Sequence, residues 1–196
     1  MSQIPLDQRL AGVLVRPLAK KSVTPNQITA FSLVLSLAGA GLFAWGEGAA
    51  IHWGAGIFMI SRFIDHMDGE LARLTGQTSR FGYIFDGIVG VIAYAALFIG
   101  MGIGFWRGGG EPWTLILPVV AGIAITVNAA LQFRMEATLD NPPPTYPSWG
   151  PFELEDGIYL IGPIVWFGYL YPLFLIGCFG TIAYLTIRTA QAVFRA

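Results

Sequence analysis

The chain has little charge. Only 12% of its 196 residues are charged, whereas about 25% is usual in soluble domains. More than half of the residues, 55%, are hydrophobic, which indicates a membrane protein with several spans. The basic residues form no patch of the kind that nucleic-acid binding needs, so we expect no nucleic-acid partner.

The chain has only one cysteine, and we expect no cleavable signal peptide. The single cysteine, Cys178, excludes an internal disulfide, and its apolar surroundings favour a packing role. Residues 1–22 are amphipathic and charged, without the apolar core and small-residue cleavage site of a secretory signal. We therefore interpret this segment as part of the membrane domain.

The apolar stretches predict an all-α fold, an integral membrane bundle of six transmembrane helices in one domain, 1–196. A basic amphipathic helix at 4–21 precedes them and is predicted to lie in the membrane interface. The final apolar stretch is divided in two, since one helix would be too long for the roughly 20 residues that cross a bilayer. The predicted spans are about 26–45, 50–73, 80–105, 113–132, 158–167 and 173–194.

The distribution of lysine and arginine predicts the orientation. With a cytoplasmic N-terminus, Arg107 is the one basic residue that falls outside. The C-terminus and the acidic residues discussed next are then cytoplasmic, and the expected location is the cell inner membrane. Tryptophans are predicted to form an aromatic belt at the outer boundary: Trp45, Trp53, Trp106 and Trp113.

Three aspartates lie unusually deep in this apolar sequence. Asp65 and Asp68 share a face of the second predicted span, and Asp86 enters from the third after a short turn. Carboxylates that converge repel one another unless a cation neutralises them, and oxygen ligands suit Mg²⁺, Mn²⁺ or Ca²⁺. The sequence therefore predicts a divalent-metal site.

Small residues lie beside these aspartates. Gly69, Ala72 and Gly82 would leave room for a flat ligand next to the metal. Equally, small residues allow membrane helices to approach each other closely, and the residues alone leave both interpretations open.

The spacing of these residues resembles the motif of the CDP-alcohol phosphotransferase family, integral-membrane enzymes of phospholipid synthesis. The family pattern is D-x2-D-G-x2-A-R-x8-G-x3-D-x3-D. This chain has Asp65-x2-Asp68-Gly69-x2-Ala72-Arg73-x8-Gly82-x3-Asp86. It departs from the pattern at one position, where Gly90 stands in place of the last aspartate.

The resemblance implies a metal-dependent transferase. Asp65, Asp68 and Asp86 would hold Mg²⁺ or Mn²⁺, and a CDP-linked lipid donor such as CDP-diacylglycerol would lie against Asp65 and Asp68. The rest of the implied donor site is Gly69, Ala72, Arg73 and Gly82. A polar alcohol would attack the β-phosphate and CMP would leave, in a protein that the family resemblance suggests is a homodimer.

The general base is the part of the site that Gly90 puts in question. In the family, the aspartate at this position is a metal ligand and the base that deprotonates the alcohol. Asp86, one turn earlier, is the candidate to serve as ligand and base together. The alternative is a pseudoenzyme that binds metal and CDP donor without turnover, and a small cation transporter is a third possibility.

Other polar residues have two interpretations each. We favour a structural, hydrogen-bonded role for His66 over a catalytic one, and we expect Glu70 to point away from Asp65. We interpret Arg134 and Arg188 as snorkelling anchors, with binding of an acceptor phosphate as the alternative. We expect a solvated helix N-terminus, in preference to residues reaching over the cavity, at Glu153, Glu155 and Asp156.

Overall fold

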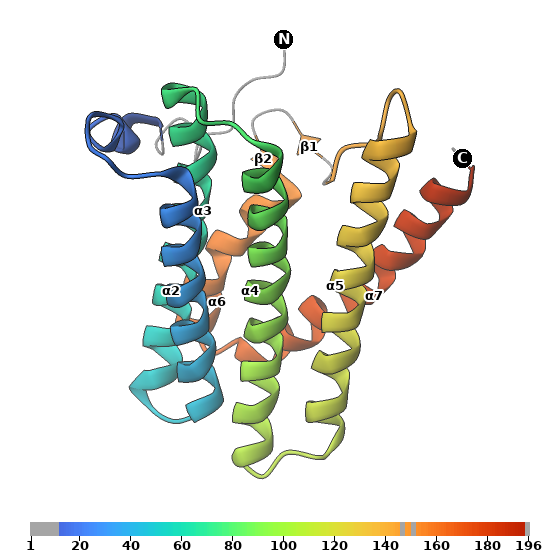
Figure 1. Cartoon of the computed structure of the whole chain (residues 1–196). Helices are drawn as coiled ribbons and strands as arrows, with labels where there is room; N and C mark the ends of the chain where they lie inside the picture. The colour runs from blue at the N-terminus through green and yellow to red at the C-terminus, as the bar shows by residue number, and fades with distance from the viewer. Residues whose placement is uncertain (1–11, 146–147, 150–151, 195–196) are drawn as a thin grey trace.

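The computed structural model describes residues 12–145, 148–149 and 152–194, and it is almost entirely helical (Figure 1). Its long helices are α2 (Pro25–Trp45), α3 (Ala49–Thr75), α4 (Arg80–Arg107), α5 (Trp113–Thr138) and α7 (Leu170–Phe194). Shorter elements are η1 (Leu18–Lys20), η2 (Leu154–Leu160) and α6 (Ile161–Trp166). Two-residue strands, β1 (Ser148–Trp149) and β2 (Phe152–Glu153), pair antiparallel.

Helices α2 to α5 stand side by side and alternate in direction, while α7 crosses the bundle obliquely (Figure 1). The start of α2, the end of α3 and the start of α4 therefore meet at one end of the bundle, drawn uppermost. We call this the upper end. Because α2 packs against both α3 and α4, residues from these three helices can share a site there.

Local signals set the helix boundaries at the upper end. Helix α2 begins after Thr24, whose backbone N–H donates to Gln27 Oε1 at 3.0 Å. Helix α3 ends just before Gly76, which has φ +67° and so adopts the left-handed conformation that glycine favours. Helix α4 then begins just after Ser79, whose hydroxyl accepts from the Gly82 N–H at 3.0 Å. This short turn makes α3 and α4 antiparallel neighbours.

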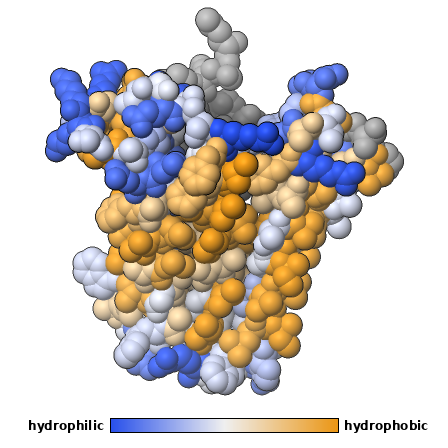
Figure 2. All heavy atoms as spheres, viewed as in Figure 1, coloured by the Kyte–Doolittle hydropathy of each residue, from blue (hydrophilic) through white to orange (hydrophobic). Residues whose placement is uncertain are grey.

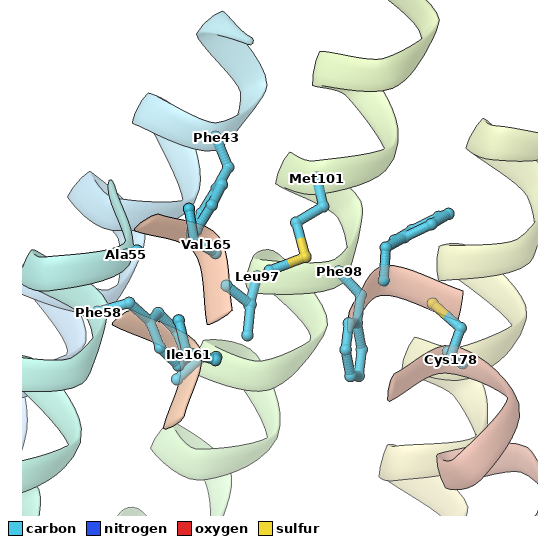
Figure 3. Packing of buried hydrophobic residues seen from close by; sticks show 12 residues of the cluster. Phe43, Ala55, Phe58, Leu97, Phe98, Met101, Ile161, Val165 and Cys178 are labelled. Carbon is cyan, nitrogen blue, oxygen red and sulfur yellow. The ribbon is translucent and has the colours of Figure 1, made fainter. Parts of the chain in front are cut away.

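Close backbone approach holds α2 against α4. A Cβ built at Gly104 would overlap the carbonyl oxygen of Phe43, so only glycine allows the two helices to lie at this distance. Around this contact, apolar side chains from α2, α3, α4, α6 and α7 pack together (Figure 3). Phe43, Phe58, Leu97 and Phe174 belong to this core and are almost completely buried.

The described residues include four helices long and apolar enough to cross a membrane: α2, α4, α5 and α7. On the face drawn in Figure 2, a wide hydrophobic band lies between more polar ends. The predicted all-α membrane architecture is thus confirmed in this coarser form. Helix α3 is not among the four, and it carries Arg62, Asp65 and Asp68.

Three predicted segments look different in the structure. Of the interfacial helix predicted at 4–21, residues 4–11 lie outside the described part of the chain, and the remainder is helical at 12–15 and in η1. The span predicted at 158–167 corresponds to the end of η2 followed by the six-residue helix α6. Helix α5 continues to Thr138, beyond the predicted end near 132.

Candidate metal and donor site

The three aspartates of the motif come together at the upper end. Asp65 and Asp68 are buried on α3, Asp86 is half-buried on α4, and carboxylate oxygens of the three lie within 4.8 Å of one another. Ionised carboxylates this close repel strongly, and a divalent cation coordinated by oxygen relieves that repulsion. The residues therefore fit a Mg²⁺ or Mn²⁺ ion.

Hydroxyl groups from α2 hold two of these carboxylates. Thr29 Oγ1 donates to Asp68 Oδ2, and Ser32 Oγ donates to Asp65 Oδ1 at 2.7 Å. Both hydroxyl residues are buried, with exposed fractions of 2% and 0%. Each carboxylate oxygen has two lone-pair sites, so one remains for a metal after the hydroxyl has bound.

A buried arginine completes this group. Arg62, only 2% exposed, lies one turn before Asp65 and donates from Nη2 to Asp65 Oδ2 at 2.5 Å. Its guanidinium carbon lies 5.1 Å from the centroid of the Tyr94 ring on α4, a cation–π distance. Asp65 is therefore held through both of its oxygens.

Of the six donor residues predicted from the motif, four line one pocket and two do not. A pocket at the upper end is lined by the three aspartates together with His66, Gly69 and Arg73. Arg73 folds over Gly69, where a built Cβ would lie 3.6 Å from its Nη1, and it pairs with Glu70 at 2.6 Å. Glu70 itself does not line the pocket.

The other two donor residues, Ala72 and Gly82, do not line this pocket and are half-buried beside it. A Cβ built at Gly82 would lie 3.2 Å from both Asn26 Oδ1 and Ser79 Oγ. Position 82 is therefore already close to side-chain oxygens from the start of α2 and from the turn before α4.

His66 faces the pocket and also binds a residue of η2. Its Nδ1 lies 3.0 Å from the Tyr159 hydroxyl, and the two rings meet edge to face. This hydrogen bond agrees with the structural role that we favoured, and it connects the end of α3 that carries Asp65 and Asp68 to the segment before α6.

Gly90 lies one turn beyond Asp86 on α4. A Cβ built there would have no described atom within 4 Å. The described surroundings of Gly90 therefore leave room for a Cβ at this position.

Arg188 is not the snorkelling anchor that we favoured. It is 1% exposed and donates from Nη1 to Pro144 O at 3.1 Å and to Gln191 Oε1 at 2.9 Å, and from Nη2 to Gln132 Oε1. Neutral oxygen atoms from α5, from α7 and from the loop after α5 accept these hydrogen bonds and keep the guanidinium inside the protein. Arg134 is exposed, whereas the side chains of the acidic group (Glu153, Glu155 and Asp156) lie outside the described part.

Our sequence interpretation missed Thr29 and Ser32, together with Tyr94 and Tyr159. A signal for the first two was present. Small polar residues recur along the first span at helical spacing, at Thr29, Ser32 and Ser36, in an otherwise apolar segment. The two tyrosines carry no comparable signal, since an aromatic residue in a membrane span usually packs in the core or faces lipid.

Comparisons with known proteins cover most of the chain. The sequence model of the CDP-alcohol phosphatidyltransferase family matches residues 22–187. An archaetidylinositol phosphate synthase from Pyrococcus horikoshii is 31% identical over 90 residues, 45% of this chain and 46% of that protein. A phosphatidylinositol phosphate synthase from Streptomyces avermitilis is 32% identical over 94 residues, 48% of this chain and 37% of that protein. The matches thus span less than half the length of these curated relatives.

A solved structure shares the fold. The crystal structure of Mycobacterium tuberculosis phosphatidylinositol phosphate synthase with CDP-DAG bound superposes with a TM-score of 0.69 at 23% identity. It covers 95% of this chain and 92% of that one. The same protein was solved with manganese and citrate, with a TM-score of 0.65 at 22% identity, covering 97% of this chain and 87% of that one.

Proposed function

Because the chain belongs to the CDP-alcohol phosphatidyltransferase family, we propose that it is a divalent-metal-dependent transferase of phospholipid synthesis. It would transfer a phosphatidyl or similar substituted phosphate from a CDP-linked lipid, such as CDP-diacylglycerol, to a polar alcohol. The observation that carries this proposal is the convergence of Asp65, Asp68 and Asp86 within 4.8 Å beside a pocket.

The proposed reaction requires few protein groups. The alcohol oxygen forms a bond to the β-phosphorus, the bond from that phosphorus to the oxygen of CMP breaks, and CMP leaves with the electron pair. Asp86 accepts the hydroxyl proton in our proposal. A divalent cation held by Asp65, Asp68 and Asp86 would neutralise charge on the pyrophosphate, which is the main requirement of such transfers.

We assign the metal to Asp65, Asp68 and Asp86, with Mg²⁺ and Mn²⁺ both chemically suitable. The cytidine side of the donor would lie over Gly69, against the guanidinium of Arg73 and towards Ala72 and Gly82. The position of Arg73 over Gly69 supports this assignment, because a cation at the rim of the pocket can bind a phosphate oxygen.

The acceptor is proposed from the relatives. Two similar proteins are named phosphatidylinositol phosphate synthases, so an inositol phosphate is the first acceptor to test. Glycerol phosphate and serine are the alternatives with a comparable hydroxyl group.

We further propose that all six predicted segments cross the membrane, with α3 and the η2–α6 segment as the two beyond the four long apolar helices. Basic residues lie near the upper end and support a cytoplasmic site in the inner membrane: Arg16, Lys20, Lys21, Arg73 and Arg80. Four exposed tryptophans lie at or near helix ends at the other end of the bundle, and they support an aromatic belt at the outer membrane boundary: Trp45, Trp53, Trp106 and Trp113. A homodimer in the membrane remains our expectation.

The test is release of CMP by the purified protein in lipid nanodiscs. CDP-diacylglycerol would be supplied with Mg²⁺ or Mn²⁺ and a panel of alcohols, with Asp68→Asn as the inactive variant. Asp140→Asn is the matched control, because Asp140 is exposed in the loop after α5. Metal-dependent CDP binding without turnover on any alcohol would support the pseudoenzyme instead.

A further inference from the structure

Residues 12–21, which we call the basic segment, lie at the upper end of the bundle and contact α3 through η1 (Figure 1). A groove of about 560 Å³ in this segment is lined by Val13 and Pro17 together with three exposed basic residues: Arg16, Lys20 and Lys21. The first 21 residues of the sequence contain four basic residues and one acidic residue, Asp7. The sequence here therefore carries an excess of positive charge.

The basic segment also carries apolar side chains, which differ in their surroundings. Val13 and Leu14 are 60% and 55% exposed, whereas the next residue, Val15, is completely buried. Val15 packs with Ile28 of α2 and Leu71 of α3 in a small apolar cluster. The segment is thus anchored to the bundle through this cluster, and it presents exposed apolar and basic side chains together. Interfacial segments bind anionic membranes with this combination.

The apolar cluster adjoins the residues that position the metal ligands. Ile28 directly precedes Thr29, whose hydroxyl donates to Asp68. Leu71 follows Asp68 by three residues and so lies on the same face of α3. The packing of Val15 therefore supports the part of α2 and α3 where the Thr29 hydroxyl meets the Asp68 carboxylate.

The start of the basic segment lies close to the donor pocket. A Cβ built at Gly12 would lie 3.7 Å from Glu70 Oε2, and Glu70 pairs at 2.6 Å with Arg73, which lines the pocket. The segment thus adjoins the proposed site at two points, the Glu70–Arg73 pair and the cluster around Val15. A ligand that holds the segment in this position would also favour the arrangement of the site.

We propose that the basic segment is a docking surface for the headgroups of anionic phospholipids, and that lipid bound there stimulates the transferase. The inference rests on the proposed function and adds a lipid site separate from that of the donor. The exposed Val13 and Leu14 offer contacts to acyl chains while the basic residues attract phosphate, so the occupant is a lipid and not a soluble anion. Each lysine or arginine near an anionic surface strengthens binding roughly fivefold.

The first test measures which lipids the whole chain retains. Native mass spectrometry of protein released from nanodiscs with equal shares of phosphatidylglycerol and phosphatidylcholine should show preferential retention of phosphatidylglycerol. The triple variant Arg16→Gln, Lys20→Gln, Lys21→Gln should lower this preference by at least roughly tenfold. The variant Arg16→Lys, Lys20→Arg, Lys21→Arg keeps the charges and should keep the preference. Arg80→Gln, which removes an exposed charge from the start of α4, should also keep it.

The second test measures CMP release at a fixed share of CDP-diacylglycerol while phosphatidylglycerol replaces phosphatidylcholine. The unaltered protein should be stimulated. The triple variant should retain its turnover in neutral lipid and respond less to phosphatidylglycerol. Surface charge that changes the local concentration of divalent metal acts on both proteins alike, so the difference between them reports on the basic segment.

Three results would overturn the inference and leave the proposed function standing wherever the unaltered protein still releases CMP. The first is equal retention of the two lipids by the unaltered protein. The second is a preference or a stimulation that persists unchanged in the triple variant. The third is displacement of the retained lipid by inorganic phosphate, which would identify a site for a small soluble anion. No CMP release in any lipid mixture would overturn the proposed function and the stimulation, while retention would still decide whether the segment binds anionic lipid.

Discussion

The hydroxyl groups of α2 offer a sharp test of how the metal ligands are positioned. Ser32 donates to Asp65 Oδ1 at 2.7 Å, while its own helix offers a competing acceptor, Thr29 O, at 2.8 Å. A hydroxyl has one hydrogen, and an ionised carboxylate is the stronger acceptor, so we expect that hydrogen to point at Asp65. Ser32→Ala removes it and leaves Asp65 Oδ1 without this partner in a buried position.

The size of the effect follows from the charge on the acceptor. A hydrogen bond to a charged group contributes about 1.5–3 kcal/mol. At about 1.4 kcal/mol per tenfold change, this corresponds to a Mn²⁺ dissociation constant weaker by roughly 10–100-fold, which is also typical for loss of a group that orients a metal ligand. Arg62 still holds the other oxygen of Asp65, so the site should be weakened and not abolished.

Ser36→Ala is the control for this experiment. Ser36 is equally buried on the same face of α2, one turn further from the aspartates, and its hydroxyl pairs with Ser61 at 2.9 Å. Both substitutions delete one buried hydroxyl and should lower the thermal stability similarly. Calorimetric titration with Mn²⁺ should separate them, because only Ser32→Ala should weaken binding. Equal dissociation constants in the two variants would refute the orienting role.

Three further predictions test other parts of the protein. Asp68→Asn should abolish metal-dependent CDP binding measured by calorimetry, whereas Asp140→Asn should not, and unchanged affinity in the first variant would contradict the assigned site. Gly90→Asp adds a second carboxylate one turn from the proposed base Asp86 and should raise the rate of CMP release, by about 10²-fold, the lower end of the usual size of general-base catalysis. A fall in rate would show that a carboxylate at position 90 does not assist Asp86. Gly104→Ala should lower the unfolding free energy by about 1–3 kcal/mol through overpacking between α2 and α4, while Gly41→Ala, with no described atom within 4 Å, should not destabilise in thermal unfolding.

The sequence predicted the acidic cluster because its geometry is mostly local. Asp65 and Asp68 lie three residues apart on one helix, and the short turn before α4 forces Asp86 towards them. The partners supplied by α2 were harder to predict. Thr29 and Ser32 are more than 30 positions away in the chain, and their contact with the aspartates depends on how α2 packs, which close backbone contacts such as that at Gly104 determine.

Arg188 shows why charge and position alone do not place a side chain in a membrane protein. A lysine or arginine side chain near the end of a span can extend to the membrane interface, or it can be buried among oxygen atoms. Burial requires hydrogen-bond acceptors from other segments of the protein. Here the acceptors are Gln132 on α5 and the carbonyl of Pro144 in the proline-rich loop. Proline has no N–H and its neighbours cannot form regular helix, so carbonyls of this loop stay available to a donor. The loop after α5 thus provides an acceptor that keeps Arg188 inside, and this contact connects the loop to α7 at the upper end of the bundle.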